Sequence, residues 1–192
     1  MRRVGLLGGT FDPPHVGHLV VAECARVELG LAEVRLLVAG DPWMKSTVSP
    51  AEDRVALARA AVEGEHALRV DDREVRRGGP TFTADTLEEL RAEEPDVEWC
   101  FLLGVDAAVD LPSWERGQDA LRLARFVVVT RPGHGLEDAP AQVRDLDHLE
   151  VPEIAISSTD LRRRYQQGGP TRFQVPPAVD DRVRELGLYG AR

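Results

Sequence analysis

The stretch GGTFDPPHVGH, residues 8–18, places two glycines, two prolines and two histidines between a short apolar run and an amphipathic one. Glycine and proline together mark a tightly shaped loop. The apolar run at 3–7 before it is typical of a buried parallel strand. Residues 16–29 carry apolar side chains on a helical period and stop at Gly30. The stretch therefore predicts a strand, a loop and a helix start, with the loop shaped to hold a ligand.

Strand-like and helix-like segments alternate along almost the whole chain. After the first strand, strands are predicted at 33–40, 67–72, 97–106 and 124–133, and helices at 49–64, 81–95, 157–169 and 177–188. Ser49 and Ser157 are the expected N-caps of their helices. Residues 133–147, rich in Gly, Pro and acidic residues, are expected to form a surface loop. The alternation predicts one α/β domain over residues 1–192, with the doubly wound parallel sheet of Rossmann-like folds.

The charge and composition of the chain indicate which partners it can bind and in which compartment it is expected. The formal net charge is -9, which argues against nucleic acid and membrane surfaces as partners. No apolar run approaches the roughly 18 residues of a membrane span, and the N-terminus lacks the pattern of a signal peptide. Cys24 and Cys100 lie in apolar stretches, so we expect two buried thiols rather than a disulfide or a metal pair. A cytoplasmic protein is expected, and a homo-oligomer stays possible.

Residues 8–18 also combine the features of a phosphate-binding loop, namely glycines, exposed backbone N–H groups and a helix N-terminus. They match neither the Walker A loop nor the dinucleotide G-x-G-x-x-G motif. His15 and His18 are three residues apart, so they share a helix face, and each can donate an N–H to a phosphate oxygen. Zinc chelation and purely structural histidines are the alternatives. Zinc usually takes three or four ligands, and no further Cys or His has a matching spacing.

Residues 8–19, GGTFDPPHVGHL, resemble the signature of the nucleotidylyltransferase superfamily, a His-x-Gly-His motif after the first strand. Further blocks resemble one branch, the nicotinate-nucleotide adenylyltransferases of bacterial NAD synthesis, in their order and spacing. These blocks are DPWMKS (41–46), RGGPTFTADTLEEL (77–90), LLGVDAAVDLPSW (102–114), ARFVVVTRPG (124–133) and ISSTDLRRRY (156–165). The resemblance implies that ATP and nicotinate mononucleotide are the substrates, and that deamido-NAD and pyrophosphate are the products. It also implies Mg²⁺ with ATP and no tightly bound cofactor.

The same resemblance implies the site residues. The expected catalytic groups are His15, His18, Lys45 and Arg162. The expected contacts of ATP and its phosphates are Gly8, Gly9, Thr10, Phe11, Gly104, Asp106, Ser157, Ser158 and Thr159. The expected contacts of the nicotinate nucleotide are Thr83, Asp110 and Trp114, with the Trp114 indole stacked on the pyridine ring. No residue is expected to be a metal ligand. Without the resemblance, Lys45 and Arg162 are typical of solvated surface charges, and Trp114 is typical of a core or lid aromatic.

The chain departs from the family pattern at two positions. Met44 stands where a histidine is common, and Asp110 stands where many members have an aromatic residue. An acid close to a substrate carboxylate is an electrostatic cost. The alternatives are an adenylyltransferase for nicotinamide mononucleotide or pantetheine phosphate, and a non-catalytic nucleotide-binding protein. The last is expected to have lost one or more of the four catalytic residues, all of which are present.

Overall fold

The computed structural model describes residues 1–42, 49–130 and 140–191. Its sheet contains six parallel strands in the order β3-β2-β1-β4-β5-β6. The strands are β1 (Arg2–Gly9), β2 (Glu33–Val38), β3 (Leu68–Asp71), β4 (Val97–Gly104), β5 (Arg125–Thr130) and β6 (Asp147–Glu150). The strand order confirms the predicted doubly wound α/β sheet, and its winding reverses between β1 and β4.

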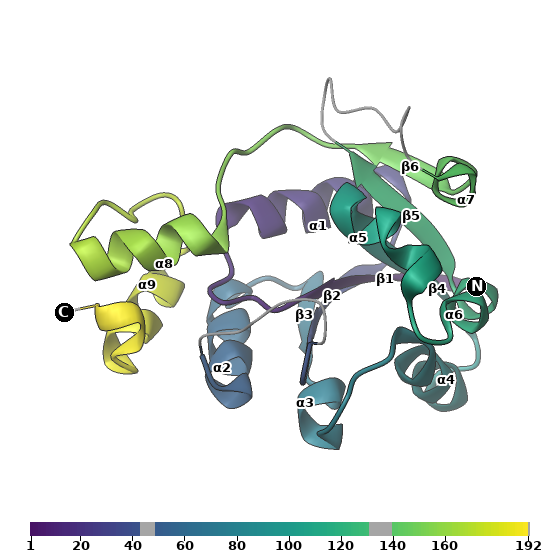
Figure 1. Ribbon diagram of the computed structural model, residues 1–192, viewed down its shortest axis with the longest axis horizontal. Coiled ribbons are helices and arrows are strands. Elements are labelled where there is room, and N and C mark those ends of the chain that lie inside the picture. Colours follow the sequence, from purple (N-terminus) through teal and green to yellow (C-terminus); the bar gives the residue numbers. More distant parts are fainter. Residues whose placement is uncertain (43–48, 131–139, 192) are drawn as a thin grey trace.

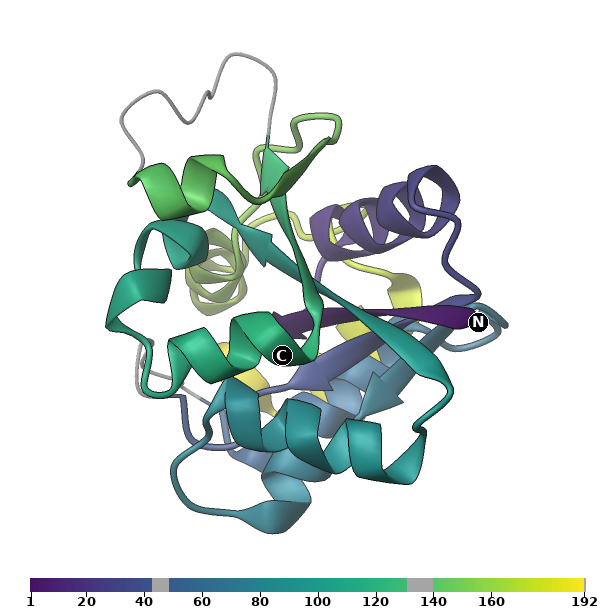
Figure 2. The same ribbon diagram turned by 90° about the vertical axis from the view of Figure 1, so that its right-hand side faces the viewer.

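Helices cover both faces of this sheet. The helices are α1 (Val16–Glu28), α2 (Ala51–Ala61), α3 (Arg73–Arg77), α4 (Thr83–Glu93), α5 (Val105–Val109), α6 (Gly117–Leu123), α7 (Ala141–Arg144), α8 (Ser158–Gln167) and α9 (Pro177–Glu185), with the 3₁₀ helices η1 (Leu111–Ser113) and η2 (Leu188–Gly190). Helices α1 and α2 pack on one face, and α4 to α7 pack on the other. Figure 2 shows α1 and α4 on opposite sides of β1. Successive side chains of β1 alternate between the two cores, Leu6 in one and Leu7 in the other, as the two-residue period of a strand requires.

The C-terminal helices form a third cluster away from the sheet. Side chains of α8, α9 and η2 pack on Leu57 and Ala61 of α2. Figure 1 shows α8 and α9 together with α2 at the end of the molecule opposite the N-terminus. This packing brings the beginning of α8 to the loop that follows β1, because the Ser158 hydroxyl donates to the Pro13 carbonyl oxygen at 2.9 Å.

Several predicted boundaries differ from the structure. The Ser157 cap is confirmed, since the Asp160 N–H donates to its hydroxyl at 3.1 Å. The Ser49 cap is wrong: α2 has Pro50 at its N-cap position, and the buried Ser49 instead donates its backbone N–H to the Asp12 carboxylate. The strand predicted to reach 106 ends at Gly104, where α5 begins.

The segment at 133–147 is not only a loop. Its described part contains α7, and β6 starts at its end; residues 131–139 lie outside the described part. Strand β6 has a single buried residue, Leu149, so it carries no apolar run that predicts a strand. Across the three described ranges, no helix is long and apolar enough to cross a membrane.

Candidate functional site

The predicted phosphate loop begins where the winding of the sheet reverses. Leu7 of β1 pairs with Leu102 of β4, which places Gly8–Gly9 and Gly104 at adjacent strand ends. Ligands of open α/β sheets bind in the crevice at such a point. A Cβ added at Gly104 meets no atom within 4 Å. The end of β4 therefore offers room for a ligand to approach the backbone.

The two histidines form one stacked unit at the start of α1. The ring centroids of His15 and His18 are 3.8 Å apart, and the Phe11 ring packs edge-on against His18 at 5.1 Å. The backbone N–H of His15, the N-cap residue, donates to Nδ1 of His18 at 3.1 Å. Because Nδ1 is the acceptor, the neutral ring carries its proton on Nε2. His18 is therefore set as an N–H donor through Nε2.

The ring of His15 packs against Gly17, which explains why a glycine stands between the two histidines. A Cβ at Gly17 stands 2.9 Å from Nδ1 of His15, closer than real Cβ contacts allow. The imidazole of His15 consequently lies over the helix backbone, 8% exposed. Residue types and spacing in this motif follow from that packing: the glycine makes space for the first ring, and the helical turn brings the second ring against it.

Contacts from the C-terminal helices fix the loop between β1 and α1. The Tyr189 hydroxyl donates to Asp12 Oδ1 at 2.6 Å. Arg162 Nη1 donates to the Asp12 carbonyl oxygen at 2.7 Å, and Ser158 binds the next carbonyl oxygen, that of Pro13. The buried Asp12 therefore shapes the loop from inside. These bonds bring Arg162 of α8 to the loop that leads into the histidine pair, across 150 residues of sequence.

The first turn of α8 has the chemistry of an anion site. Ser157 caps the helix, and Thr159 accepts a bond from Arg162 Nη2 at 3.3 Å through its hydroxyl oxygen. A helix N-terminus carries partial positive charge, which favours an anion. The bonds to Asp12 and Thr159 use one N–H each of a guanidinium that has five. Arg162 thus keeps donors for a ligand while its position is set by the loop.

The residues expected at the nicotinate nucleotide come from elements on the other face of the sheet. Thr83 opens α4, exposed Asp110 precedes η1, and Trp114 follows η1. The half-buried Trp114 ring packs edge-on against Phe101 of β4, with centroids 6.3 Å apart. Its Nε1 is buried and has no hydrogen-bond partner among the described residues. Asp106 is exposed in the first turn of α5, directly after Gly104.

The loop after β2 is held by Arg54 of α2, a residue that was not predicted from the sequence. Lys45 and Met44 lie outside the described residues. The preceding part of this loop is held by Arg54 of α2, which is 1% exposed and donates to carbonyl oxygens of Thr10, Ala39 and Gly40. Burial lowers the pKa of Arg54. A signal was present in the sequence, since position 54 falls on the helical stripe of apolar positions 57, 58 and 61.

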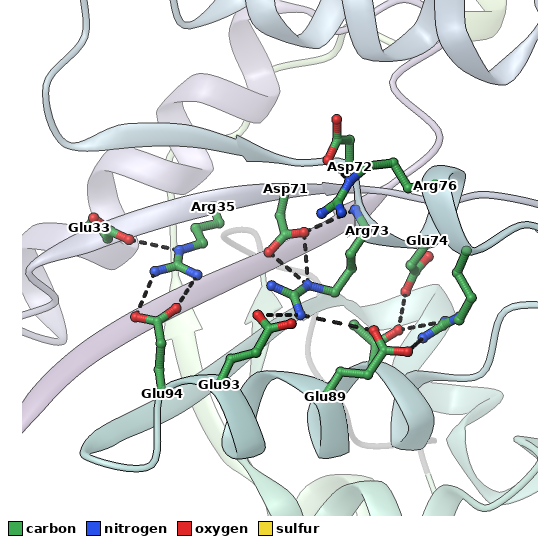
Figure 3. A network of polar contacts seen from close by, with 12 residues as sticks. Glu33, Arg35, Asp71, Asp72, Arg73, Glu74, Arg76, Glu89, Glu93 and Glu94 are labelled. Carbon is green, nitrogen blue, oxygen red and sulfur yellow. Dashed lines mark hydrogen bonds and ion pairs between the residues drawn. The ribbon is translucent and has the colours of Figure 1, made fainter.

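A buried carboxyl group lies on the opposite side of the same loop. Glu74 of α3 is 4% exposed and accepts from the Thr86 hydroxyl of α4 at 2.9 Å. Arg77 donates to that hydroxyl at 3.0 Å. Figure 3 shows Glu74 beside the ion-pair network of Asp71, Arg73 and Glu93. Burial raises the pKa of Glu74 to about 7, against opposing contributions from Thr86, from Arg77 and from the Gly40 N–H.

The raised pKa of Glu74 predicts a pH-dependent stability. Between pH 4.5 and 7 the folded protein holds a proton that the unfolded chain has lost, so its stabilisation is present below pH 4.5 and disappears as the pH rises through 7. Relative to Glu74→Gln, the wild-type free energy of unfolding should fall by about 2–4 kcal/mol from pH 4.5 to pH 8. Urea unfolding of both proteins across this range measures the difference. Parallel pH profiles of the two proteins contradict the prediction.

The described side chains form no metal-binding cluster. In the described part of the chain, no group of three or more His, Cys, Asp or Glu could hold a metal ion. The described residues around the histidine pair thus resemble a site for phosphates more than a metal cage, with N–H donors, a guanidinium and two helix N-termini.

Comparisons with known proteins place the chain among nucleotide-transferring enzymes by name and by fold. The family model described as Cytidylyltransferase-like matches residues 6–164. A probable nicotinate-nucleotide adenylyltransferase of Streptomyces coelicolor is 42% identical over 95% of this chain and 98% of the relative. The one of Saccharopolyspora erythraea is 40% identical over 98% and 90%. The structure of a Plasmodium falciparum nicotinic acid mononucleotide adenylyltransferase complexed with NaAD superposes with a TM-score of 0.81 at 17% identity, over 100% of this chain and 99% of that chain. The last comparison supports the fold.

Proposed function

The chain belongs to the nicotinate-nucleotide adenylyltransferase family, within the wider cytidylyltransferase-like family, and we therefore propose that it joins ATP and nicotinate mononucleotide to give deamido-NAD and pyrophosphate. One observation in the structure supports this assignment. The stacked pair of His15 and His18 stands at the N-terminus of α1, where the sheet winding reverses, and Arg162 is bonded to the same loop. Donors and charge thus converge where phosphates bind.

The reaction needs positioning and charge neutralisation more than covalent help from the protein. A phosphate oxygen of the mononucleotide forms a bond to the α-phosphorus of ATP. The bond from that phosphorus to the bridging oxygen breaks, and pyrophosphate leaves with the electron pair. We assign the Nε2–H of His18 and the guanidinium of Arg162 to the charge that develops on the phosphate oxygens. His15 orients His18 through its backbone N–H and its ring.

Other groups in the proposal hold the two substrates. Gly8, Gly9, Thr10 and the first turn of α8 are proposed to border the phosphates. Asp106 follows open Gly104 in the first turn of α5, and we propose that it accepts hydrogen bonds from ribose hydroxyls. The nicotinate nucleotide is assigned to the α4 and η1 side. There Trp114 offers a ring face for stacking, and backbone N–H groups near Thr83 and Asp110 are proposed to meet the carboxylate.

Mg²⁺ is proposed to arrive bound to ATP. The triphosphate oxygens supply ligands that Mg²⁺ prefers, whereas the described residues offer no cluster of three or more acidic, His or Cys side chains for it. The ion would supply further neutralisation of phosphate charge. A cytoplasmic location is also proposed, and the free thiols of Cys24 and Cys100 are consistent with a reducing compartment.

Pyrophosphate release with ATP and each candidate co-substrate tests the function. We expect kcat/KM for nicotinate mononucleotide to exceed that for nicotinamide mononucleotide by roughly 10–100-fold. Backbone donors suit the carboxylate, whereas the amide NH₂ faces another donor, a mismatch that costs about 1–3 kcal/mol. Asp110 works against the anionic substrate, so Asp110→Asn should keep or strengthen this preference.

Three outcomes contradict the assignment. Equal values for the two mononucleotides, or a preference for the amide, favour a nicotinamide mononucleotide adenylyltransferase. Pyrophosphate release with pantetheine phosphate alone favours that enzyme class instead. Tight ATP binding without pyrophosphate release, with every mononucleotide, favours a non-catalytic nucleotide-binding protein.

A further inference from the structure

A buried arginine connects the two loops that border the phosphate site. Arg54 lies in the first turn of α2 and is 1% exposed. Its Nη1 donates to the Thr10 carbonyl oxygen at 3.1 Å and to the Ala39 carbonyl oxygen at 2.6 Å. Its Nη2 donates to the Gly40 carbonyl oxygen at 2.8 Å. Thr10 belongs to the loop after β1, whereas Ala39 and Gly40 belong to the loop after β2.

The partners of Arg54 are unusual for a buried cation. A buried charge is ordinarily paired with a carboxylate, because desolvation costs several kcal/mol per ion. Arg54 instead binds three backbone carbonyl oxygens, while the Asp12 and Asp41 charges act on it from farther away. A planar guanidinium can serve several acceptors at once in a fixed geometry. The arrangement therefore fixes the relative position of two backbone segments.

The loop after β2 is also held from its other side. The backbone N–H of Gly40 opposes the rise in the pKa of the Glu74 carboxyl group. A Cβ at Gly40 stands 2.5 Å from the backbone oxygen of Glu74, so α3 packs directly against this glycine. Asp41 forms an isolated bridge with Pro80. Gly40 therefore lies between the guanidinium of Arg54 on one side and the backbone of α3 on the other.

We propose that Arg54 is a positioning residue for adenylyl transfer, locking the phosphate loop after β1 to the loop after β2 through the carbonyl groups of Thr10 and Gly40. The inference rests on the proposed function. Among the described residues Arg54 bonds to backbone carbonyl groups, and its side chain is 1% exposed, so its effect passes through the phosphate-binding groups of the first loop. Displacing such groups by about 1 Å can cost about 10²-fold in rate.

This role has a kinetic signature that general destabilisation lacks. Arg54→Met removes all three bonds at similar side-chain length. It should lower kcat by roughly 10–100-fold and raise the KM of ATP. The KM of nicotinate mononucleotide should stay unchanged, because its proposed site is built from α4 and η1. Arg54→Lys keeps the charge but not the fork, and we expect an intermediate loss.

Gly40→Ala is an independent variant that leaves Arg54 in place. The added Cβ meets the backbone oxygen of Glu74 at 2.5 Å, so the packing of the loop after β2 against α3 must change, and we expect this to displace the loop from Arg54. The same signature is expected, with lower kcat and higher KM for ATP. This variant keeps the inference testable if Arg54→Met does not fold.

Arg73→Met is the matched control. Arg73 is also a buried guanidinium, 9% exposed, but it donates to Asp71 and Glu93 and binds neither loop. Its loss leaves a buried carboxylate without that partner, which is destabilising. We therefore expect a lower unfolding temperature with unchanged kcat and KM values, measured below the temperature at which the variant begins to unfold.

Initial rates with both substrates, together with calorimetric titration of ATP, decide the question. The inference is supported if the Arg54 and Gly40 variants lose kcat and ATP affinity while Arg73→Met keeps both. It is overturned if folded Arg54→Met or Arg54→Lys matches wild type, or if Arg73→Met shows the same signature. Wild-type enzyme that releases no pyrophosphate overturns the proposed function instead. In that case the ATP titration still reports on Arg54, and unchanged affinity in Arg54→Lys and Gly40→Ala overturns the positioning role.

Discussion

Replacing His18 with alanine should lower kcat by about 10²–10³-fold, the typical effect of removing one donor to transition-state charge. His18 accepts the His15 N–H through Nδ1 at 3.1 Å, so the proton of its neutral ring is on Nε2, the group that we assign to the ligand. The fold should survive, because the lost cap bond contributes only about 0.5–1.5 kcal/mol. Turnover and free energy of unfolding should thus separate in this variant.

His18→Asn distinguishes the two ends of the imidazole. The asparagine oxygen can replace Nδ1 as acceptor for the His15 N–H, but the shorter side chain does not reach the position of Nε2. We expect wild-type stability with the low kcat of the alanine variant. His66→Ala, in the exposed segment before β3, is the control histidine and should keep full turnover. Native turnover in His18→Asn removes the Nε2 donor from the mechanism.

The sheet could be predicted because its central strands are buried on both faces. Such strands appear in the sequence as short apolar runs, as in VGLL of β1 and CFLL of β4. Gly and Pro then mark many of the boundaries, as Gly168 does with φ 66 at the end of α8. Edge strand β6 escaped prediction because Leu149 is its sole buried residue.

Site residues in a local motif could be predicted from the sequence, whereas residues with partners far along the chain could not. His15 and His18 belong to a local motif, so residue type and spacing predict their proximity. Arg162 was predicted from the family resemblance alone. Its partner Asp12 is 150 residues away, so local spacing does not connect the two. Arg54 and Tyr189 were missed. Arg54 binds backbone carbonyl groups, which every residue carries, and Tyr189 reaches an aspartate 177 residues earlier. The helical stripe of positions 54, 57, 58 and 61 indicates that Arg54 is buried, but neither contact leaves a pattern in the sequence that identifies its partner.

Replacing Arg162 with methionine should lower kcat/KM for ATP by about 10²–10³-fold, comparable to the loss at His18. Arg162 brings a fixed positive charge to the first turn of α8, in a chain whose formal net charge is -9. The surrounding acidity offers little to replace it. Arg162→Lys keeps the charge but loses the planar fork that suits phosphate oxygens, so only partial activity is expected.

Two neighbouring residues separate the charge of Arg162 from its role as an anchor. Arg162 donates to the Asp12 carbonyl oxygen at 2.7 Å, and Ser158 donates to the adjacent Pro13 carbonyl oxygen at 2.9 Å. Ser158→Ala therefore loosens the same loop without removing a charge, and it should lower kcat/KM much less than Arg162→Met.

Arg163→Met removes an equal charge from the same helix, but that side chain is 63% exposed and pairs with Asp160, so wild-type kinetics are expected. Equal losses in Ser158→Ala and Arg162→Met reduce Arg162 to an anchor, because the charge then contributes nothing that the loop bond does not. A loss confined to Arg162 places its guanidinium at the phosphates. Arg163 carries the same charge on the same helix, so only contact with the developing charge can explain a difference between the two variants.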